Sequence, residues 1–184
     1  IDLHLHDQQE AGKQTLLRLA DLTEEAGLQG KVTVSHAFWF ASAPVQEAKE
    51  VAERMASLGM TIASTVPIGR STMPLPMLHN LGVHVKLATD SLTDHWSPFG
   101  SGDQLERAGR FAELYGYNDE YALSQSLGFI TAGVTPLNQK GEQVWPNVGD
   151  PASFVLLPAS CSAEAVARRT PRQAVWYKGS LVSG

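Results

Sequence analysis

Two histidines and one aspartate are the residues of this sequence best suited to chemistry. His4 and His36 each stand at or near the end of a short β-prone stretch, and Asp90 follows a third such stretch. Two imidazoles and a carboxylate form a ligand set that suits zinc or ferrous iron. Taken singly, a strand histidine is more often structural, and an aspartate after a strand more often caps a helix. Their recurrence at successive strand ends favours a shared metal site.

Two carboxylates follow the first of these histidines closely. Asp7 lies just past His4, and Glu10 comes three residues later. A carboxylate held beside a water that a metal activates can accept its proton and pass it to a leaving group. Glu10 has a second interpretation, because an acidic side chain also favours the first turn of a helix. We therefore expect Asp7 to move protons and Glu10 to stabilise the helix start.

The elements that must position these residues alternate between strands and helices. A complete (β/α)8 barrel takes roughly 250 residues, so four strand–helix units make about half of one. The active-site face of such a barrel lies at the C-terminal strand ends, where the three residues are expected to converge. Apolar spacing predicts strands over 1–6, 31–36, 60–65 and 83–88 in a parallel sheet, and helices over 12–26, 45–58 and 77–81.

The sequence changes character after Asp90. Two further helices are predicted, followed by a segment rich in turn residues and by short β-prone pieces around one more helix. The predicted helices cover 103–115, 119–133 and 163–169, the turn-rich segment covers 135–151, and the β-prone pieces cover 152–157, 174–177 and 181–182.

Composition narrows the class of protein. The 184 residues are 43% hydrophobic with a net charge of −5, which fits a folded core and excludes disorder and collagen. The basic residues are scattered, so we expect no nucleic-acid partner. Cys161 is the single cysteine and no apolar run is long enough to cross a membrane, which favours the cytoplasm. The opening Ile1 begins directly on a strand, so we expect the chain to be part of something longer.

These motifs resemble the amidohydrolase superfamily and, within it, the cytosine deaminase group. The resemblance covers nearly the whole chain, but only the C-terminal half of such an enzyme. Ile1–Asp7 resembles the fifth barrel strand, whose histidine binds the metal and is followed by an acidic proton shuttle. Thr33–His36 resembles the sixth strand, whose histidine faces metal and substrate. Leu87–Asp90 resembles the eighth strand, whose aspartate binds the metal.

The resemblance implies an α/β fold: the C-terminal half of a (β/α)8 TIM-type barrel, strands 5 to 8, plus the C-terminal strands of a small β-sandwich domain. The barrel part would cover residues 1–148 and the small β domain residues 149–184. Zinc or iron would be held by His4, His36 and Asp90, with His36 and Asp90 also acting in catalysis. The stretch from Asp94 to Gly100, including Trp96, resembles a wall of the substrate pocket.

Several positions depart from the family pattern. Asp7 replaces the glutamate of cytosine deaminases, so the shuttle is either Asp7 in a tighter site or Glu10 reaching back. Ser91 replaces a second aspartate that contacts the pyrimidine, which predicts a substrate other than cytosine. The histidine pair of the first barrel strand is missing, and His6 is expected either to line the substrate pocket or to support a metal ligand from behind. His79 and His84 are interpreted as structural.

The resemblance leads to one expected activity and two alternatives. The expected activity is hydrolytic deamination of a cyclic amidine or aminated heterocycle. The first alternative is hydrolysis of a ring amide on the same scaffold. The second is a half-barrel that is inactive by itself and whose partner is the missing N-terminal half. An open sheet edge also predicts self-association into homo-oligomers.

Overall fold

The computed structural model describes residues 1–69, 72–93 and 98–184, which form two compact units. The first unit runs from Ile1 to Asp90 and the second from Ser91 to Gly184. The domain boundary predicted after residue 148 falls inside the second unit and stays a prediction. Within the described ranges, no helix combines the length and the apolar character needed to cross a bilayer.

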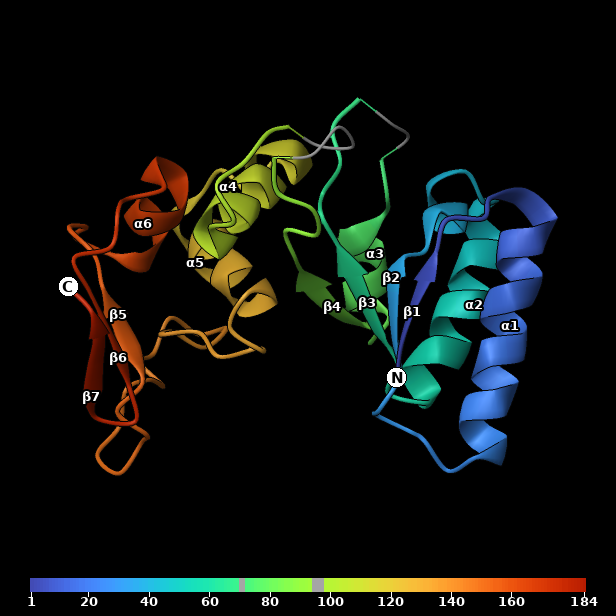
Figure 1. Cartoon of the computed structure of the whole chain (residues 1–184), viewed down its shortest axis with the longest axis horizontal. Helices are drawn as coiled ribbons and strands as arrows, with labels where there is room; N and C mark the ends of the chain where they lie inside the picture. The colour runs from blue at the N-terminus through green and yellow to red at the C-terminus, as the bar shows by residue number, and fades with distance from the viewer. Residues whose placement is uncertain (70–71, 94–97) are drawn as a thin grey trace. The chain divides into compact units, whose positions relative to one another are not determined.

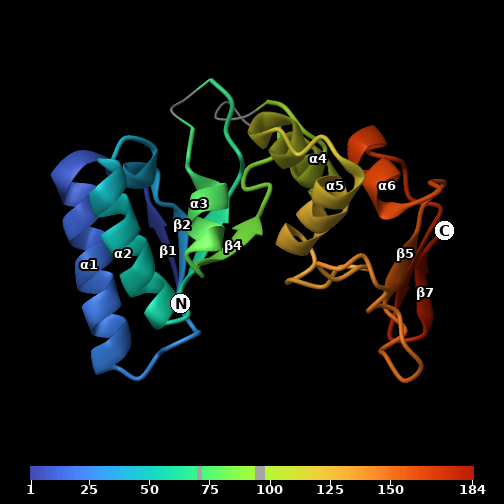
Figure 2. The same ribbon diagram turned by 180° about the vertical axis from the view of Figure 1, so that it is seen from behind.

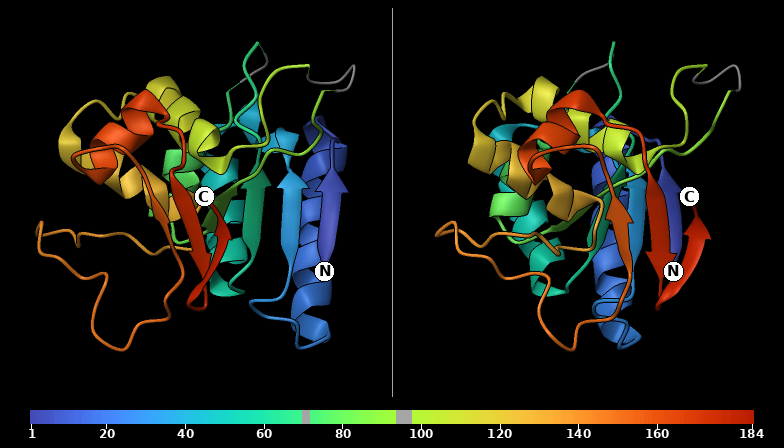
Figure 3. Two further views of the ribbon diagram at one scale, coloured as in Figure 1. Left: turned by 60° about the vertical axis from the view of Figure 1, so that its left-hand side comes forward. Right: turned by 90° about the vertical axis from the view of Figure 1, so that its left-hand side faces the viewer.

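The first unit is built on a four-stranded parallel sheet (Figure 1). Neighbouring strands are also consecutive in the chain, as successive βαβ units require. The C-terminal ends of β1, β2 and β3 lie at the same edge of the sheet (Figure 3). The strands, in sheet order, are β1 (Asp2–Leu5), β2 (Thr33–His36), β3 (Thr61–Ser64) and β4 (His84–Leu87).

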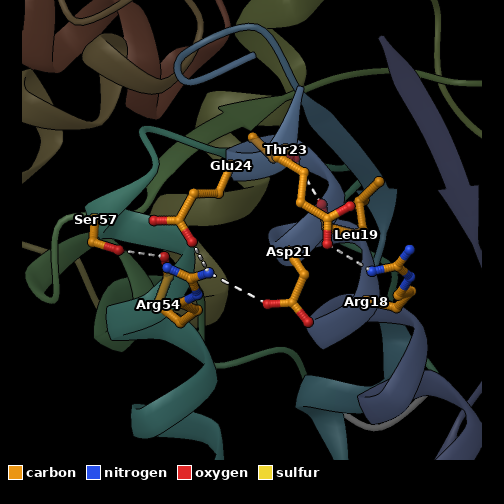
Figure 4. Close-up of polar contacts among 8 residues, drawn as sticks. Arg18, Leu19, Asp21, Thr23, Glu24, Arg54 and Ser57 are labelled. Atoms are coloured by element: carbon orange, nitrogen blue, oxygen red, sulfur yellow. Dashed lines mark hydrogen bonds and ion pairs between the residues drawn. The ribbon is translucent and has the colours of Figure 1, made fainter. Parts of the chain in front are cut away.

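Three helices cover one face of this sheet (Figure 2), namely α1 (Gln9–Glu25), α2 (Val45–Ser57) and α3 (Leu75–Asn80). The inward side of α2 carries buried apolar residues at helical spacing, such as Val51 and Met55. At the outer surface, Arg54 of α2 reaches α1 and bonds Asp21 at 3.3 Å and Glu24 at 2.7 Å (Figure 4). Apolar burial and these ion pairs together fix α1 against α2.

The opposite face of the sheet is polar. In the edge strand β1, Asp2 and His4 are exposed and share one face, whereas Leu5 is buried. In the other edge strand β4, His84 and Lys86 are exposed while the alternate residues are buried. Side-chain alternation therefore places the charged and imidazole groups on the face away from the helices.

The second unit contains three α-helices around a small apolar cluster: α4 (Gln104–Tyr115), α5 (Glu120–Ser126) and α6 (Ser162–Arg168). Asp103 and Asp119 cap α4 and α5 by accepting backbone N–H groups of the first turn. The cluster at the centre of these helices consists of Leu105, Ala108, Ala112 and Val166.

A three-stranded antiparallel sheet completes the second unit, with β5 (Phe154–Leu156), β6 (Ala174–Tyr177) and β7 (Ser180–Ser183) in that order. Phe154 and Trp176 stack across the β5–β6 pair, with their ring centroids 5.9 Å apart. The three β-prone pieces predicted in this region are therefore strands. Their membership of a β-sandwich stays a prediction.

Three of the predicted helix ranges are wrong. The helix expected over 12–26 begins earlier and is Gln9–Glu25. The helix expected over 119–133 ends at Ser126 and continues only as a short 3-10 turn over Leu127–Phe129, because Gly128 and Gly133 weaken further helix. The helix expected over 77–81 is Leu75–Asn80 instead. Its first turn includes a proline, which helices accept there because that N–H needs no intrahelical partner.

Candidate metal centre

The structure brings together His4, His36 and Asp90, the three residues at which the sequence predicts metal ligands. One ligand atom from each lies within 4.8 Å of the other two. His36 Nε2 is 3.3 Å from His4 Nδ1 and 3.9 Å from Asp90 Oδ2. The His36 side chain is buried, whereas His4 and Asp90 are exposed. We call these three residues the metal cluster.

The backbone at two cluster residues is in the left-handed region. His36 has φ of 74° and Asp90 has φ of 55°, and neither is a glycine. Regular alternation would place His36 on the same face as buried Val34, but this conformation breaks the alternation and His36 meets His4. Such a conformation costs on the order of 1–3 kcal/mol and is characteristic of functional sites.

The surroundings of His36 favour its neutral form. Burial lowers the pKa of this imidazole below its ordinary value, and the nearby His6 lowers the pKa further. The carboxylate of Asp90 raises the pKa, but by less than burial lowers it. A neutral imidazole is also the form that a metal ion requires of a histidine ligand.

His6 lies beside the cluster, although it is not one of its three members. Its ring is tilted against that of His36, with centroids 4.4 Å apart, and 5.8 Å from the ring of Phe38. Phe38 belongs to the 3-10 helix η1 (Phe38–Ala41), which apolar periodicity does not predict. The aromatic run Phe38–Phe40, which begins two residues after His36, is the signal that could identify this turn.

The two carboxylates considered as proton shuttles have different surroundings. Asp7 is exposed in the loop between β1 and α1. Glu10 lies in the first turn of α1, where its carboxylate accepts a hydrogen bond of 2.6 Å from Gln14 Nε2. Glu10 thus has the helix environment expected of a stabilising residue, whereas Asp7 is on the loop that follows the first candidate ligand.

Two predicted pocket residues come from the chain after Asp90. Ser91 is half-buried and opens the second unit. Trp96 lies outside the described residues.

The donor atoms of the cluster fit a divalent transition metal. Two imidazole nitrogens and one carboxylate oxygen match the preferences of zinc and ferrous iron. Three protein ligands also leave a coordination position for water or substrate, which distinguishes catalytic from closed structural zinc sites. Parallel strands with such a cluster at their C-terminal ends are the arrangement of a barrel-type metalloenzyme site.

A sequence model described as the amidohydrolase family matches residues 1–183, and the chain therefore belongs to this family. Among curated proteins, it is 51% identical to the uncharacterized protein YahJ of Escherichia coli K12 over its full length. It is 30% identical, over 99% of its length, to N-isopropylammelide isopropyl amidohydrolase of a Pseudomonas species. The chain spans 40% and 45% of these two proteins, less than half of either.

Comparison with solved structures also finds hydrolases of this type, of which the chain again covers less than half. N-isopropylammelide isopropylaminohydrolase of Burkholderia multivorans aligns over 98% of this chain and 46% of its own, with a TM-score of 0.83 and 31% identity. The 5-methylcytosine deaminase of Klebsiella pneumoniae aligns over 99% and 47%, with a TM-score of 0.78. At 19% identity this second likeness concerns the fold alone. The resemblance to the amidohydrolase superfamily and its cytosine deaminase-like fold is confirmed.

Proposed function

We propose that this chain carries half of the barrel and part of the metal site of a hydrolase that releases an amine from a small planar heterocycle. The observation that carries the proposal is the convergence of His4, His36 and Asp90 at one edge of the sheet. In this proposal β1 to β4 are strands 5 to 8 of a (β/α)8 barrel. The partner that completes the barrel is the other half of such an enzyme.

Each residue of the site has a role that suits its position. His4, His36 and Asp90 would hold zinc or iron, which when bound acts as a Lewis acid and lowers the pKa of water. Asp90 also orients the attacking water, and His36 donates a hydrogen bond that polarises the substrate. Asp7 accepts a proton and delivers it to the departing amine. Without this proton the amine would have to depart as an amide anion, which is a poor leaving group.

The substrate class follows from the rings near the cluster and from the named relatives. His6 and Phe38 provide flat surfaces that suit a planar ring. The relatives that are 30% and 31% identical to this chain are both named for N-isopropylammelide, and their names indicate a ring that loses an amine. Ser91 offers one neutral hydroxyl where cytosine deaminases carry a carboxylate, so we propose an aminated heterocycle other than cytosine.

Steady-state assays on the complete barrel protein, loaded with Zn²⁺ or Fe²⁺, test this proposal. Amine release is measured for cytosine, isoguanine, creatinine-like and pterin-like compounds and N-alkylated aminotriazines. We expect His36→Ala to abolish release and His84→Ala, a histidine of the same sheet outside the cluster, to preserve it. Absence of release from every compound by the metal-loaded protein would refute the proposed activity, and cytosine as best substrate would refute the specificity.

Hydrolysis of a ring amide is the second candidate. It uses the same metal cluster but opens the ring instead of releasing an amine. The relatives named for removal of an isopropyl amine favour deamination. Mass spectrometry separates the two reactions, because ring opening adds water to the substrate whereas deamination exchanges an amine for oxygen.

We also propose that the 184-residue chain is inactive by itself. Among the described residues, no further strand pairs with β1 or β4 at the two edges of its parallel sheet, so the chain supplies only four of the eight strands that a closed barrel needs. Assays of the chain with and without the other barrel half test this point. Turnover by the chain alone, at the rate of the complete protein, would contradict it.

A further inference from the structure

The carboxylate of Asp2 lies next to the cluster residue His4 on the polar face of the sheet. Asp2 and His4 are alternate residues of β1, so their side chains share a face. Asp2 Oδ2 is 3.8 Å from His4 Nε2. The function proposed above does not assign any role to Asp2.

Ser35 holds this carboxylate from the neighbouring strand. In the β1–β2 pair, Ser35 stands in register with His4. The Ser35 hydroxyl donates a hydrogen bond of 3.0 Å to Asp2 Oδ1. Ser35 is itself buried, whereas the Asp2 side chain is 54% exposed and would otherwise rotate more freely. The serine thus restricts the orientation of the carboxylate.

The two ring nitrogens of His4 have different neighbours. Nδ1 lies 3.3 Å from His36 Nε2 and belongs to the cluster, whereas Nε2 is on the side of Asp2. A neutral imidazole carries one N–H and one lone pair, and a carboxylate can only accept hydrogen bonds. The Asp2 charge therefore favours the proton on Nε2, which leaves the lone pair on Nδ1 facing the cluster.

The distance defines how this contact acts. At 3.8 Å the two atoms are too far apart for a direct hydrogen bond, so the carboxylate acts on the ring through its charge. Carboxylates that accept the second N–H of a ligating histidine orient the ring and make it a stronger ligand. The Asp2–Ser35 pair occupies the position of such a partner relative to His4.

We propose that Asp2, held by Ser35, is a positioning residue that fixes the Nε2–H tautomer of His4 and presents Nδ1 to the metal. The inference rests on the proposed metal-dependent function, because it assigns the partner of a candidate ligand. It extends the site from the three cluster residues to the polar pair beside them.

Histidine NMR tests the tautomer without metal or activity. In the metal-free complete barrel protein, labelled with ¹⁵N-histidine and held at pH 8.5, where free imidazole is neutral, we expect the Nε2–H form to dominate at His4. Asp2→Ala should raise the Nδ1–H population, and Ser35→Ala should raise it less. The control Ser57→Ala, which removes a hydroxyl bonded to Arg54 O on α2, should leave the spectrum of His4 unchanged. An unchanged tautomer in Asp2→Ala refutes the proposal.

Zinc competition in the complete barrel protein provides the second readout. We expect Asp2→Ala to weaken Zn²⁺ binding by about 10–100-fold and Asp2→Asn, which keeps an acceptor oxygen, to weaken it less. Circular dichroism confirms that each variant is folded before it is compared. Zinc binding that is lost in His4→Ala but unaltered in Asp2→Ala overturns the positioning role and leaves the proposed function intact. No zinc binding in the wild type overturns the proposed function, while the tautomer result still decides the role of Asp2.

Discussion

Asp7 and Glu10 lie close together in the chain but have different surroundings. Glu10 accepts a hydrogen bond from Gln14 of its own helix, whereas Asp7 lies in the loop before that helix. We therefore expect Asp7→Asn to lower kcat of the complete enzyme by about 10²–10⁴-fold, the range of a positioned acid or base. Glu10→Gln should change kcat little and act mainly on stability, because its charge favours the helix N-terminus. Rates of amine release at saturating substrate measure both effects.

Both variants preserve side-chain size, so each tests charge and proton transfer rather than packing. Thermal unfolding of the two proteins provides the control for stability. Equal losses of kcat, or a larger loss in Glu10→Gln, would assign proton transfer to Glu10 instead.

Much of the candidate site could be predicted from single residues. His4, His36 and Asp90 were identified because polar ligands recur at the ends of otherwise apolar strands, and they do converge. The left-handed backbone that brings His36 into the cluster could not be predicted, because alternation alone places it on the opposite face. The ring contacts of Phe38 depend on a 3-10 turn that has no apolar periodicity.

The packing of α1 against the loop before it depends on Gly12. A Cβ at this position would lie 2.4 Å from the Asp7 backbone oxygen and 2.9 Å from Trp39 Cβ, and neither atom can rotate away. We expect Gly12→Ala to lower the free energy of unfolding by about 1–3 kcal/mol, as overpacking does. Urea denaturation measures the change.

Gly128→Ala is the matched control, because its Cβ would meet its nearest neighbour, Thr135 Cγ2, at an ordinary 3.4 Å. We expect a smaller loss there than in Gly12→Ala. An equal loss of unfolding free energy in both variants would show that the close contacts at Gly12 are not the reason why this position requires glycine.

A partly exposed ion pair between Asp103 and Arg172 makes the second unit sensitive to acid. Asp103 accepts hydrogen bonds from Arg172 and from the Leu105 N–H, and the bond from Arg172 is the main cause that lowers the pKa of its carboxyl. The pKa is therefore lower in the folded than in the unfolded protein. The stability that this ion pair contributes is fully present above the ordinary aspartate pKa. It is lost as the pH falls through the lower pKa that Asp103 has in the folded protein.

We expect Arg172→Gln to be less stable than the wild type at about pH 7, with the difference shrinking towards about pH 3 as the aspartate is protonated. Urea unfolding at a series of pH values measures this difference. Arg168→Gln, on α6, provides a control for the loss of one positive charge. A difference between Arg172→Gln and wild type that does not depend on pH would contradict the assigned ion pair.

At the scale of elements, the order of strands and helices was predictable from apolar spacing and from glycine and proline positions. All four parallel strands lie within the predicted ranges, and the end of each is within two residues of its prediction. The length of α5 was not predictable, because apolar residues continue past Ser126 into a turn. Apolar residues at helical spacing do not reveal the point at which a 3-10 turn with its own hydrogen bonds becomes more stable than a further turn of α-helix.

The whole chain leaves the outer edges of its parallel sheet without a pairing strand among the described residues. Unpaired edges of this kind associate with other chains. The second unit adds exposed apolar side chains on β7, with Leu181 56% and Val182 65% exposed. We expect the isolated chain to form oligomers or aggregates at micromolar concentration.

Light scattering over a dilution series measures this association. Addition of the other barrel half should reduce it, because those strands would pair with β1 and β4. A monodisperse monomer at micromolar concentration would contradict the prediction.

The sheet order also sets when the metal cluster can form during folding. His4 and His36 meet once β1 pairs with β2, but Asp90 follows β4, which is joined to β2 only through β3. Parallel pairing closes a long loop at each step, so it is slow compared with helix formation. The complete ligand set therefore appears only after the last strand has docked. In the proposed site, a metal that needs all three ligands would bind only chains whose sheet is finished, and by mass action it would draw partly folded chains towards that state.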